Sequence, residues 1–451
     1  MIRTRKIFFS KSGLGSHDWL TSPRLIIVAA ILHLAMTATI YEIGRHGVMP
    51  GSFDANGTAV SFAHDGVKYR EETITQAELL RQGRIHDWLA APSEFHVKLY
   101  AICFALFGPW LGLNILSAEP LNLLCYLAIL ILVFQVGRDA FDQRAGMIAA
   151  VIVGLWPSLL IHTTQLLKDP WFIAGMLAFI LINLRLLSRS FSWKQALLTG
   201  GGGGLIALLV WFVRDNMGQL LPAAAMLGAA MLILRQLQER RFLVTNLGGM
   251  LLLSLMTLGA TQVMPEFDRP DNPRTAAVKM IEQEEQRAGN ARPRSGLAKR
   301  VGLLRRRFVL MYPGSGSNLD SNVQLNSTAD VIGYLPRAAA IGFFAPFPNM
   351  WFASGELVGS SGRRLSGIET LAMYALEGLA LVGLWKGRRR LPVWLLASIA
   401  ATGVIALGLV VVNVGALYRL RYVFLILIII IAAKAVTDFF ASLRANPPEK
   451  V

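Results

Sequence analysis

One polar stretch near the N-terminus decides how the rest of the chain is interpreted: Ser61-Phe-Ala-His-Asp65-Gly-Val-Lys-Tyr69-Arg-Glu-Glu-Thr-Ile-Thr-Gln-Ala77-Glu-Leu-Leu80. It follows the first apolar run that is long enough to cross a membrane, residues 25–44. Its polar composition places it outside the hydrocarbon, and it carries Asp65 soon after that run. A carboxylate at the lipid–water boundary avoids the cost of burying a charge in lipid. We therefore expect Asp65 in a loop beside the membrane.

The composition agrees with a chain built mainly of membrane-spanning helices. Of 451 residues, 54% are hydrophobic and only 16% are charged, whereas about 25% of residues are charged in soluble domains. The net charge is +16, and the basic residues lie beside apolar runs, which indicates contact with anionic membrane lipid and no nucleic-acid partner. The two cysteines, Cys103 and Cys125, lie in apolar stretches and imply no disulfide.

The hydropathy pattern predicts an all-α polytopic membrane protein with about 10 transmembrane helices, within a range of 9–12. The run Leu99 to Leu116 is interrupted by Gly108-Pro109, and we interpret it as a re-entrant or interfacial pair of short helices. Five consecutive glycines, 200–204, indicate close approach of two helices. The predicted spans lie near 25–44, 120–137, 145–163, 170–187, 195–213, 217–234, 242–262, 367–386, 391–412 and 416–437.

The distribution of positive charge predicts the orientation. Short loops rich in Lys and Arg alternate with loops that hold little positive charge, which places both termini in the cytoplasm of an inner-membrane protein. Two long polar segments, 45–98 and 263–366, then lie outside, and residues 73–89 have the pattern of an amphipathic interfacial helix. The basic residues of the cytoplasmic loops are Arg138, Arg144, Arg185, Arg189, Lys194, Arg235, Arg240, Arg241, Lys386, Arg388, Arg389 and Arg390.

These features divide the chain into three parts. Residues 1–262 form an N-terminal transmembrane module that includes a first extracytoplasmic loop, 45–119. Residues 263–366 form a large extracytoplasmic loop with further interfacial helices, and 367–451 form the C-terminal transmembrane helices and a cytoplasmic tail.

Several polar side chains are predicted to meet at the extracytoplasmic face. Arg419 and Arg421 precede a wholly apolar run, so they need an anionic partner. A sugar carried on a lipid phosphate supplies one, because its phosphate lies at headgroup level and its tail in the hydrocarbon. Arginine suits phosphate through paired hydrogen bonds and lysine through a point charge. The residues that we expect to bind substrate are Tyr69, Lys168, Arg214, Arg419, Arg421 and Tyr422.

Transfer of the sugar also needs a base that deprotonates the acceptor hydroxyl. Asp65 is our candidate, and Asp54 is its nearest rival. Asp169 lies in another loop at the same face, but it precedes Pro170 and could simply cap the next helix. The histidine spacing fits no zinc motif. The sequence therefore requires no cofactor, and a divalent metal is possible but not indicated.

The pattern Asp-x3-Tyr-x7-Ala-x2-Leu, formed by Asp65, Tyr69, Ala77 and Leu80, resembles the first extracytoplasmic loop of GT-C fold glycosyltransferases that use polyprenyl phosphate. Protein O-mannosyltransferases and lipid A aminoarabinose transferases belong to that superfamily. The resemblance implies that the acidic residue of this loop is the catalytic base, that a second acid near Asp169 assists, and that the anomeric centre is inverted. The resemblance covers residues 60–190. It extends to residues 415–430 through the Arg-x-Arg-Tyr sequence, although the prolines that usually follow this sequence in the family are missing here.

We therefore expect a hexosyl or pentosyl transferase of cell-envelope polysaccharide biosynthesis, with a polyprenyl-phosphate sugar donor and a glycan, lipid or protein acceptor. One alternative is an O-antigen or exopolysaccharide polymerase or ligase that uses a lipid-diphosphate glycan. Another is a lipid-linked saccharide transporter, which would have inverted repeats and charges in mid-membrane. The sequence favours the transferase, because its charged residues cluster at one predicted face.

Overall fold

The computed structural model describes residues 23–48, 50–53, 60, 63, 65–214, 217, 219–263, 296–312, 315–352 and 359–445. Eight of its helices are long and apolar enough to cross a membrane, and a bent pair would make a ninth. The chain is therefore an all-α polytopic membrane protein, as predicted. The eight helices are α1 (Pro23–Arg45), α5 (Ile115–Ala140), α8 (Asp169–Ser188), α9 (Trp193–Val213), α10 (Leu220–Glu239), α15 (Gly359–Gly387), α16 (Leu391–Val410) and α18 (Tyr422–Ala445).

The bent pair and one further helix account for the other predicted spans. Helices α6 (Gln143–Gly154) and α7 (Pro157–Thr163) replace the single span expected at 145–163, and their axes differ by 68°. Proline lacks an N–H group and keeps the preceding residue out of the helical conformation, so the helix breaks before Pro157. Helix α11 (Val244–Val263) corresponds to the expected span 242–262, and the part whose side chains are described, Val244–Ala260, is apolar.

The first polar loop is more helical than the sequence indicated. Helix α2 (Asp65–Arg81) begins at Asp65 itself, so this residue opens a helix and does not lie in a loop. The expected amphipathic helix 73–89 is divided between α2 and α3 (Ile85–Ala90), because Gly83 adopts a positive φ of 72°.

The predicted break at Gly108-Pro109 is wrong. Helix α4 (Phe95–Leu111) continues through Pro109 and ends at Gly112, whose φ of 80° suits glycine. The run Leu99 to Leu116 is therefore one helix, a turn and the start of α5. That start is fixed by Asn114, whose side chain accepts a hydrogen bond from Leu116 N.

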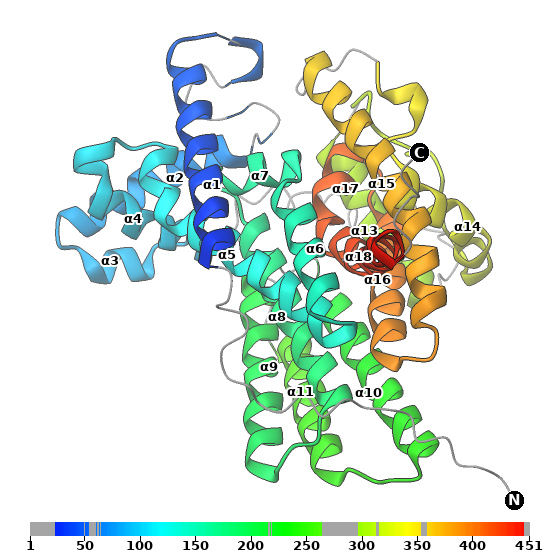
Figure 1. The fold of residues 1–451 in the computed structure, drawn as a ribbon. Coiled ribbons are helices and arrows are strands. Elements are labelled where there is room, and N and C mark those ends of the chain that lie inside the picture. Colours follow the sequence, from blue (N-terminus) through cyan, green and yellow to red (C-terminus); the bar gives the residue numbers. More distant parts are fainter. Residues whose placement is uncertain are drawn as a thin grey trace, which may run out of the picture.

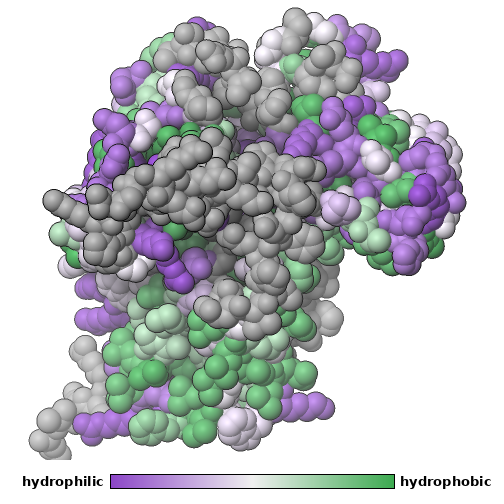
Figure 2. Space-filling view, turned by 180° about the vertical axis from the view of Figure 1, so that it is seen from behind, coloured by the Kyte–Doolittle hydropathy of each residue, from purple (hydrophilic) through white to green (hydrophobic). Residues whose placement is uncertain are grey.

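Figure 1 shows how these helices are arranged. Helices α2, α3 and α4 lie together on one side of α1, while α9, α10 and α11 stand together in the lower part of the view. The glycine run gives the close packing that was predicted, because a Cβ atom on Gly200 would collide with the backbone of Gly249 in α11. Figure 2 shows a largely apolar surface over this lower part, bounded below by hydrophilic residues, as expected for a face that contacts lipid.

The C-terminal part adds a second helical layer. Helix α13 (Gly296–Met311) and helix α14 (Thr328–Phe344) pack against α16, and α15 packs along α18. The span expected at 416–437 begins later than predicted. A short helix, α17 (Val414–Leu420), ends at Arg421, and α18 starts at Tyr422. Arg419 and Arg421 therefore lie at a junction between two helices.

Candidate active site

The structure brings the candidate base to the C-terminal arginine pair. Asp65, the first residue of α2, accepts a hydrogen bond through Oδ2 from Nη2 of Arg419 in the last turn of α17, at 2.6 Å. Nη1 of the same guanidinium lies 4.0 Å from Oδ2 of Asp169. Arg419 thus bridges two acids that belong to the N-terminal part of the chain, and the sequence places these residues hundreds of positions apart.

Asp169 lies deeper than Asp65 and has its own arginine. It is the first residue of α8 and is 3% exposed. Its Oδ1 accepts a hydrogen bond from Nη2 of Arg214, at 2.9 Å, and the Arg214 guanidinium lies over the Phe172 ring. The N-cap of α8 is Lys168, and no side chain caps this end. The alternative in which Asp169 only caps its helix therefore does not hold.

Lys168 extends the cluster toward the first polar loop. Its Nζ donates to Oε2 of Glu94 at 3.0 Å and lies 5.7 Å from the centre of the Tyr69 ring. Tyr69 is buried and lies one turn after Asp65 in α2. The structure thus groups Tyr69 and Lys168 as predicted and adds Glu94, which the sequence analysis did not identify.

A fully buried histidine lies beneath these residues. The ring of His96 in α4 packs edge-on against Tyr69, with 4.4 Å between the ring centres, and its Nδ1 is 3.6 Å from Oε2 of Glu94. Burial lowers the pKa of His96 to about 3, with a further lowering by Lys168 and an opposite effect of Glu94. The imidazole is therefore neutral at pH 7, and neither ring nitrogen has a hydrogen-bond partner among the described residues.

The two acids differ in access. The Asp65 side chain is 47% exposed, whereas that of Asp169 is 4% exposed. Partial burial raises the pKa of Asp65, but the charge and hydrogen bond of Arg419 together outweigh that effect, so the pKa lies below its usual value. Asp65 is thus an ionised carboxylate that a substrate can reach, while Asp169 is placed to hold arginines in position.

Arg421 has a different environment, which corrects the expectation that it joins Arg419. It is 1% exposed, and its Nη1 donates to the carbonyl oxygens of Gly342, at 2.8 Å, and Phe343, at 3.2 Å. These carbonyls close the C-terminal end of α14, where a cation is favourable. The structure does not bring Arg421 to the acidic cluster.

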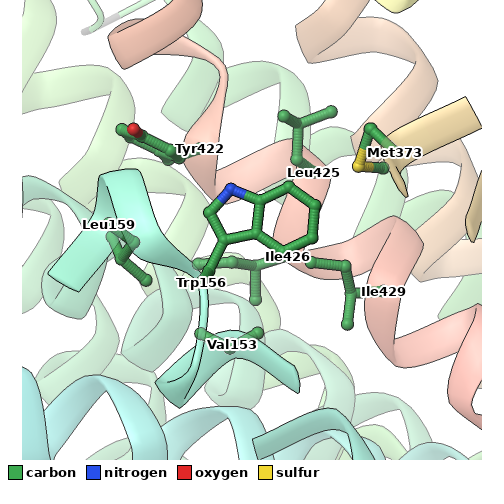
Figure 3. A pocket seen from close by; sticks show the side chains of 8 residues that line it. All are labelled: Val153, Trp156, Leu159, Met373, Tyr422, Leu425, Ile426 and Ile429. Atoms are coloured by element: carbon green, nitrogen blue, oxygen red, sulfur yellow. The ribbon is translucent and has the colours of Figure 1, made fainter. Parts of the chain in front are cut away.

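Tyr422 belongs to another polar network, which surrounds the break between α6 and α7. Its hydroxyl donates to Oγ of Ser158 at 2.6 Å and lies 3.4 Å from Nδ1 of His162. Glu369 of α15 accepts from the backbone N–H of Ser158 at 2.6 Å and from the hydroxyl of Tyr418. Figure 3 shows the small apolar pocket beside this network, with the Trp156 indole between side chains of α6, α7, α15 and α18.

Two further sequence-based expectations concern Asp54 and metals. Asp54, the rival base, lies outside the described residues. Over the ranges that the structure describes, no group of three or more His, Cys, Asp or Glu side chains is placed to hold a metal ion.

Sequence reasoning missed Glu94, His96 and Glu369. Glu369 carried a usable signal, because an acid within a membrane-length apolar run is rare and normally functional or paired. Glu94 and His96 carried none, because they belong to no motif and their role depends on how α4 packs against α2.

The solved structures include a distant likeness to this chain. No family model and no curated protein sequence matches the chain. The crystal structure of ArnT from Cupriavidus metallidurans bound to undecaprenyl phosphate aligns with 79% of this chain and 70% of that chain, at 14% identity and a TM-score of 0.30. At these values the likeness carries no argument about this chain, so the proposal below rests on the chain's own residues.

Proposed function

We propose that the chain is a GT-C-type glycosyltransferase that moves a sugar from a polyprenyl-phosphate donor to an acceptor outside the cytoplasm. The supporting observation is the alternating series Asp65, Arg419, Asp169 and Arg214, in which three of the four side chains are largely buried. Ionisable groups are costly within a membrane protein, so such a cluster marks a functional site. The pattern around Asp65 that resembles this superfamily adds independent support.

The geometry suits a single displacement with Asp65 as base. The acceptor hydroxyl gives its proton to the Asp65 carboxylate while its oxygen bonds to the anomeric carbon. The bond from that carbon to the phosphate oxygen breaks, and the lipid phosphate leaves with the electron pair. The ionised and accessible state of Asp65 is the state that this step needs. Asp169 is already paired with Arg214 and lies 4.0 Å from Arg419, so it keeps both arginines in place.

Cations near the leaving group would stabilise the departing phosphate. Nη1 of Arg419 and Nε of Arg214 are buried and lack a hydrogen-bond partner among the described residues, so both guanidinium groups can still donate. Lys168 lies beside them on the same turn as Asp169. We assign the phosphate to Arg419, Arg214 and Lys168, and the sugar-facing surface to Tyr69.

The contact between Arg419 and Asp65 would also couple donor binding to catalysis. A phosphate that binds Arg419 competes with the Asp65 carboxylate for the same guanidinium. Loss of this contact removes the effect that lowers the pKa of Asp65, so the carboxylate becomes a stronger base once the donor is bound.

Glycolipid analysis of a deletion strain tests this proposal. Complementation with the wild-type chain should restore a glycosylated envelope component, and Asp65→Asn should fail to restore it while the sugar–lipid phosphate accumulates. Asp87→Asn is the matched control, because Asp87 is 48% exposed and also pairs with an arginine, Arg84, at 2.7 Å. Restoration by Asp65→Asn would refute the proposed base. Release of a lipid diphosphate would instead favour the polymerase or ligase alternative.

The proposed topology has its own test. Reporter fusions at Arg138 and Arg389 should indicate the cytoplasm, and fusions at Gly83 and Asn318 should indicate the extracytoplasmic side. A cytoplasmic signal at Gly83 would place Asp65 on the wrong side of the membrane for this function.

A further inference from the structure

A buried polar network inside the helical bundle lies apart from the site described above. His33 of α1 is fully buried, and its Nδ1 is 2.7 Å from Oε1 of Glu119 in α5. Thr37, one turn after His33, donates to Oε2 of Glu119 at 2.7 Å. On the other side of the ring, Nε2 of His33 is 3.1 Å from Oγ1 of Thr163, the last residue of α7. All four residues are nine-tenths or more buried.

Hydrogen-bond accounting indicates the protonation state of His33. A hydroxyl group has one hydrogen, and Thr163 donates it to the carbonyl oxygen of Leu160 at 2.9 Å. In this arrangement the Thr163 oxygen would accept from Nε2 of His33. With Nδ1 donating to the Glu119 carboxylate, both ring nitrogens would carry hydrogens, as in an imidazolium paired with a carboxylate. The Tyr126 ring, 4.6 Å from the His33 ring between centres, favours a cation there.

The network connects to the candidate active site through the turn between α7 and α8. Thr163 is followed by that turn, which leads to Lys168 and Asp169. The same turn holds Gln165, whose side chain accepts from the backbone N–H of Val60 at 3.3 Å, ahead of Asp65. A contact that fixes Thr163 therefore restrains the turn that ends at Asp169 and holds Val60.

We propose that His33 and Glu119 form an intramembrane ion pair that acts as a positioning device for the turn carrying Lys168 and Asp169. The effect of this ion pair on catalysis rests on the proposed function. The charge state of the pair and its effect on the turn do not depend on that function. In lipid, apolar contacts give no hydrophobic driving force between helices, so polar contacts make a larger relative contribution to their association. Helix α1 exposes Ile27, Ile31 and Leu34, and its buried face carries His33 and Thr37.

The cost of breaking such a pair makes the inference testable. Removing one partner leaves the other charge buried without compensation, which is strongly unfavourable. The Glu119→Gln variant keeps the shape of the side chain but removes the carboxylate. His33 should then lose one proton, and with it the Nε2–H group that donates to Thr163. Ring-nitrogen spectra of protein labelled with 15N-histidine report this directly, and the His33→Gln variant identifies the two signals.

At pH 7 the wild-type His33 signals should be those of an imidazolium, and in Glu119→Gln they should become those of a neutral ring. A neutral His33 ring in the wild type would overturn the ion pair.

Hydrogen exchange tests the proposed positioning of the turn. Backbone amides of 164–169 should exchange about tenfold faster or more in Glu119→Gln and Thr163→Val, while Thr163→Ser, which keeps the hydroxyl, should restore wild-type exchange.

Thr257→Val in α11 is the matched control, because Thr257 is also fully buried and donates only to Leu253 O of its own helix, at 2.7 Å. It should leave the exchange of 164–169 unchanged. Equal exchange in the wild type, Glu119→Gln and Thr163→Val would overturn the positioning role. If the turn loosens but the wild-type chain transfers no sugar, the proposed function fails and the ion-pair inference stands. In an active enzyme, Glu119→Gln should lower kcat more than it raises KM for the donor.

Discussion

Arg419 and Arg421 are two residues apart, yet the structure gives them opposite surroundings. Arg419 contacts two carboxylates, one of them half exposed, and keeps a donor without a partner in the described part of the chain. Arg421 is almost fully buried and donates to the backbone carbonyls at the end of α14. The break between α17 and α18 separates them, because it turns the two side chains toward different neighbours.

This difference shows how a charge in a membrane protein should be interpreted. Both arginines satisfy the rule that a cation beside an apolar run needs a partner. For Arg421 the partner is the protein's own backbone, which indicates a structural role. For Arg419 the partners are two acids, one of them half exposed, which indicates a site. The predictions that follow test whether this contrast is real.

The largest effect is expected for the base. Asp65→Asn keeps the size of the side chain but removes the proton acceptor, so turnover should fall about a hundredfold or more. Donor affinity should not fall, because the carboxylate that competes for Arg419 is removed. Kinetics of the purified enzyme in lipid nanodiscs measure both quantities, and Asp87→Asn should behave like the wild type. If Asp54→Asn lost turnover and Asp65→Asn did not, the roles of these two acids would have to be exchanged.

A smaller effect, on stability, is expected at Arg421. Arg421→Gln leaves carbonyl oxygens of α14 without their buried donor, which should cost about 1–3 kcal/mol in the free energy of unfolding. Arg388→Gln is the matched control, since Arg388 also donates to a carbonyl, Trp385 O at 2.7 Å, but is exposed. Thermal unfolding in detergent compares the two variants. Equal stability would mean that the contact with α14 contributes nothing.

The smallest effect is a shift in pH dependence. Burial raises the pKa of Asp65 and Arg419 lowers it. Arg419→Gln removes the largest effect that lowers this pKa, so the pKa should rise. A base must be ionised, so activity is lost as the pH falls through its pKa. In a plot of kcat/KM against pH, the acidic limb should therefore move to higher pH in Arg419→Gln. An unchanged limb would show that another group titrates there.

Much of the architecture could be predicted from sequence because it depends on local properties. Apolar runs of sufficient length predicted the spans, and the glycine run predicted the packing of α9 on α11 at Gly200. Helix breaks were less accessible. Pro157 divides one predicted span, whereas Pro109 does not interrupt α4, and the difference lies in the tertiary contacts of each helix.

The site was only partly predictable for the same reason. The polar residues that end spans, such as Asp169 and Arg214, were correctly grouped because topology brings such ends together. The separation of Arg421 from Arg419 depends on the side-chain direction at a helix junction, which no pattern encodes. The expectation that charges cluster at one face also missed His33 and Glu119. His33 lies within the predicted span 25–44, where an ionisable residue is itself a signal, and Glu119 immediately precedes the predicted span 120–137.

The most direct test of the contrast between the two arginines is the affinity of the purified protein for undecaprenyl phosphate in nanodiscs. Arg419→Gln should weaken binding by about tenfold or more, because it removes a charge-assisted hydrogen bond to phosphate. Arg421→Gln, measured below its unfolding temperature, should bind like the wild type. Equal weakening in both variants, or weakening in Arg421→Gln alone, would contradict the assignment of the phosphate to the Asp65–Arg419 cluster.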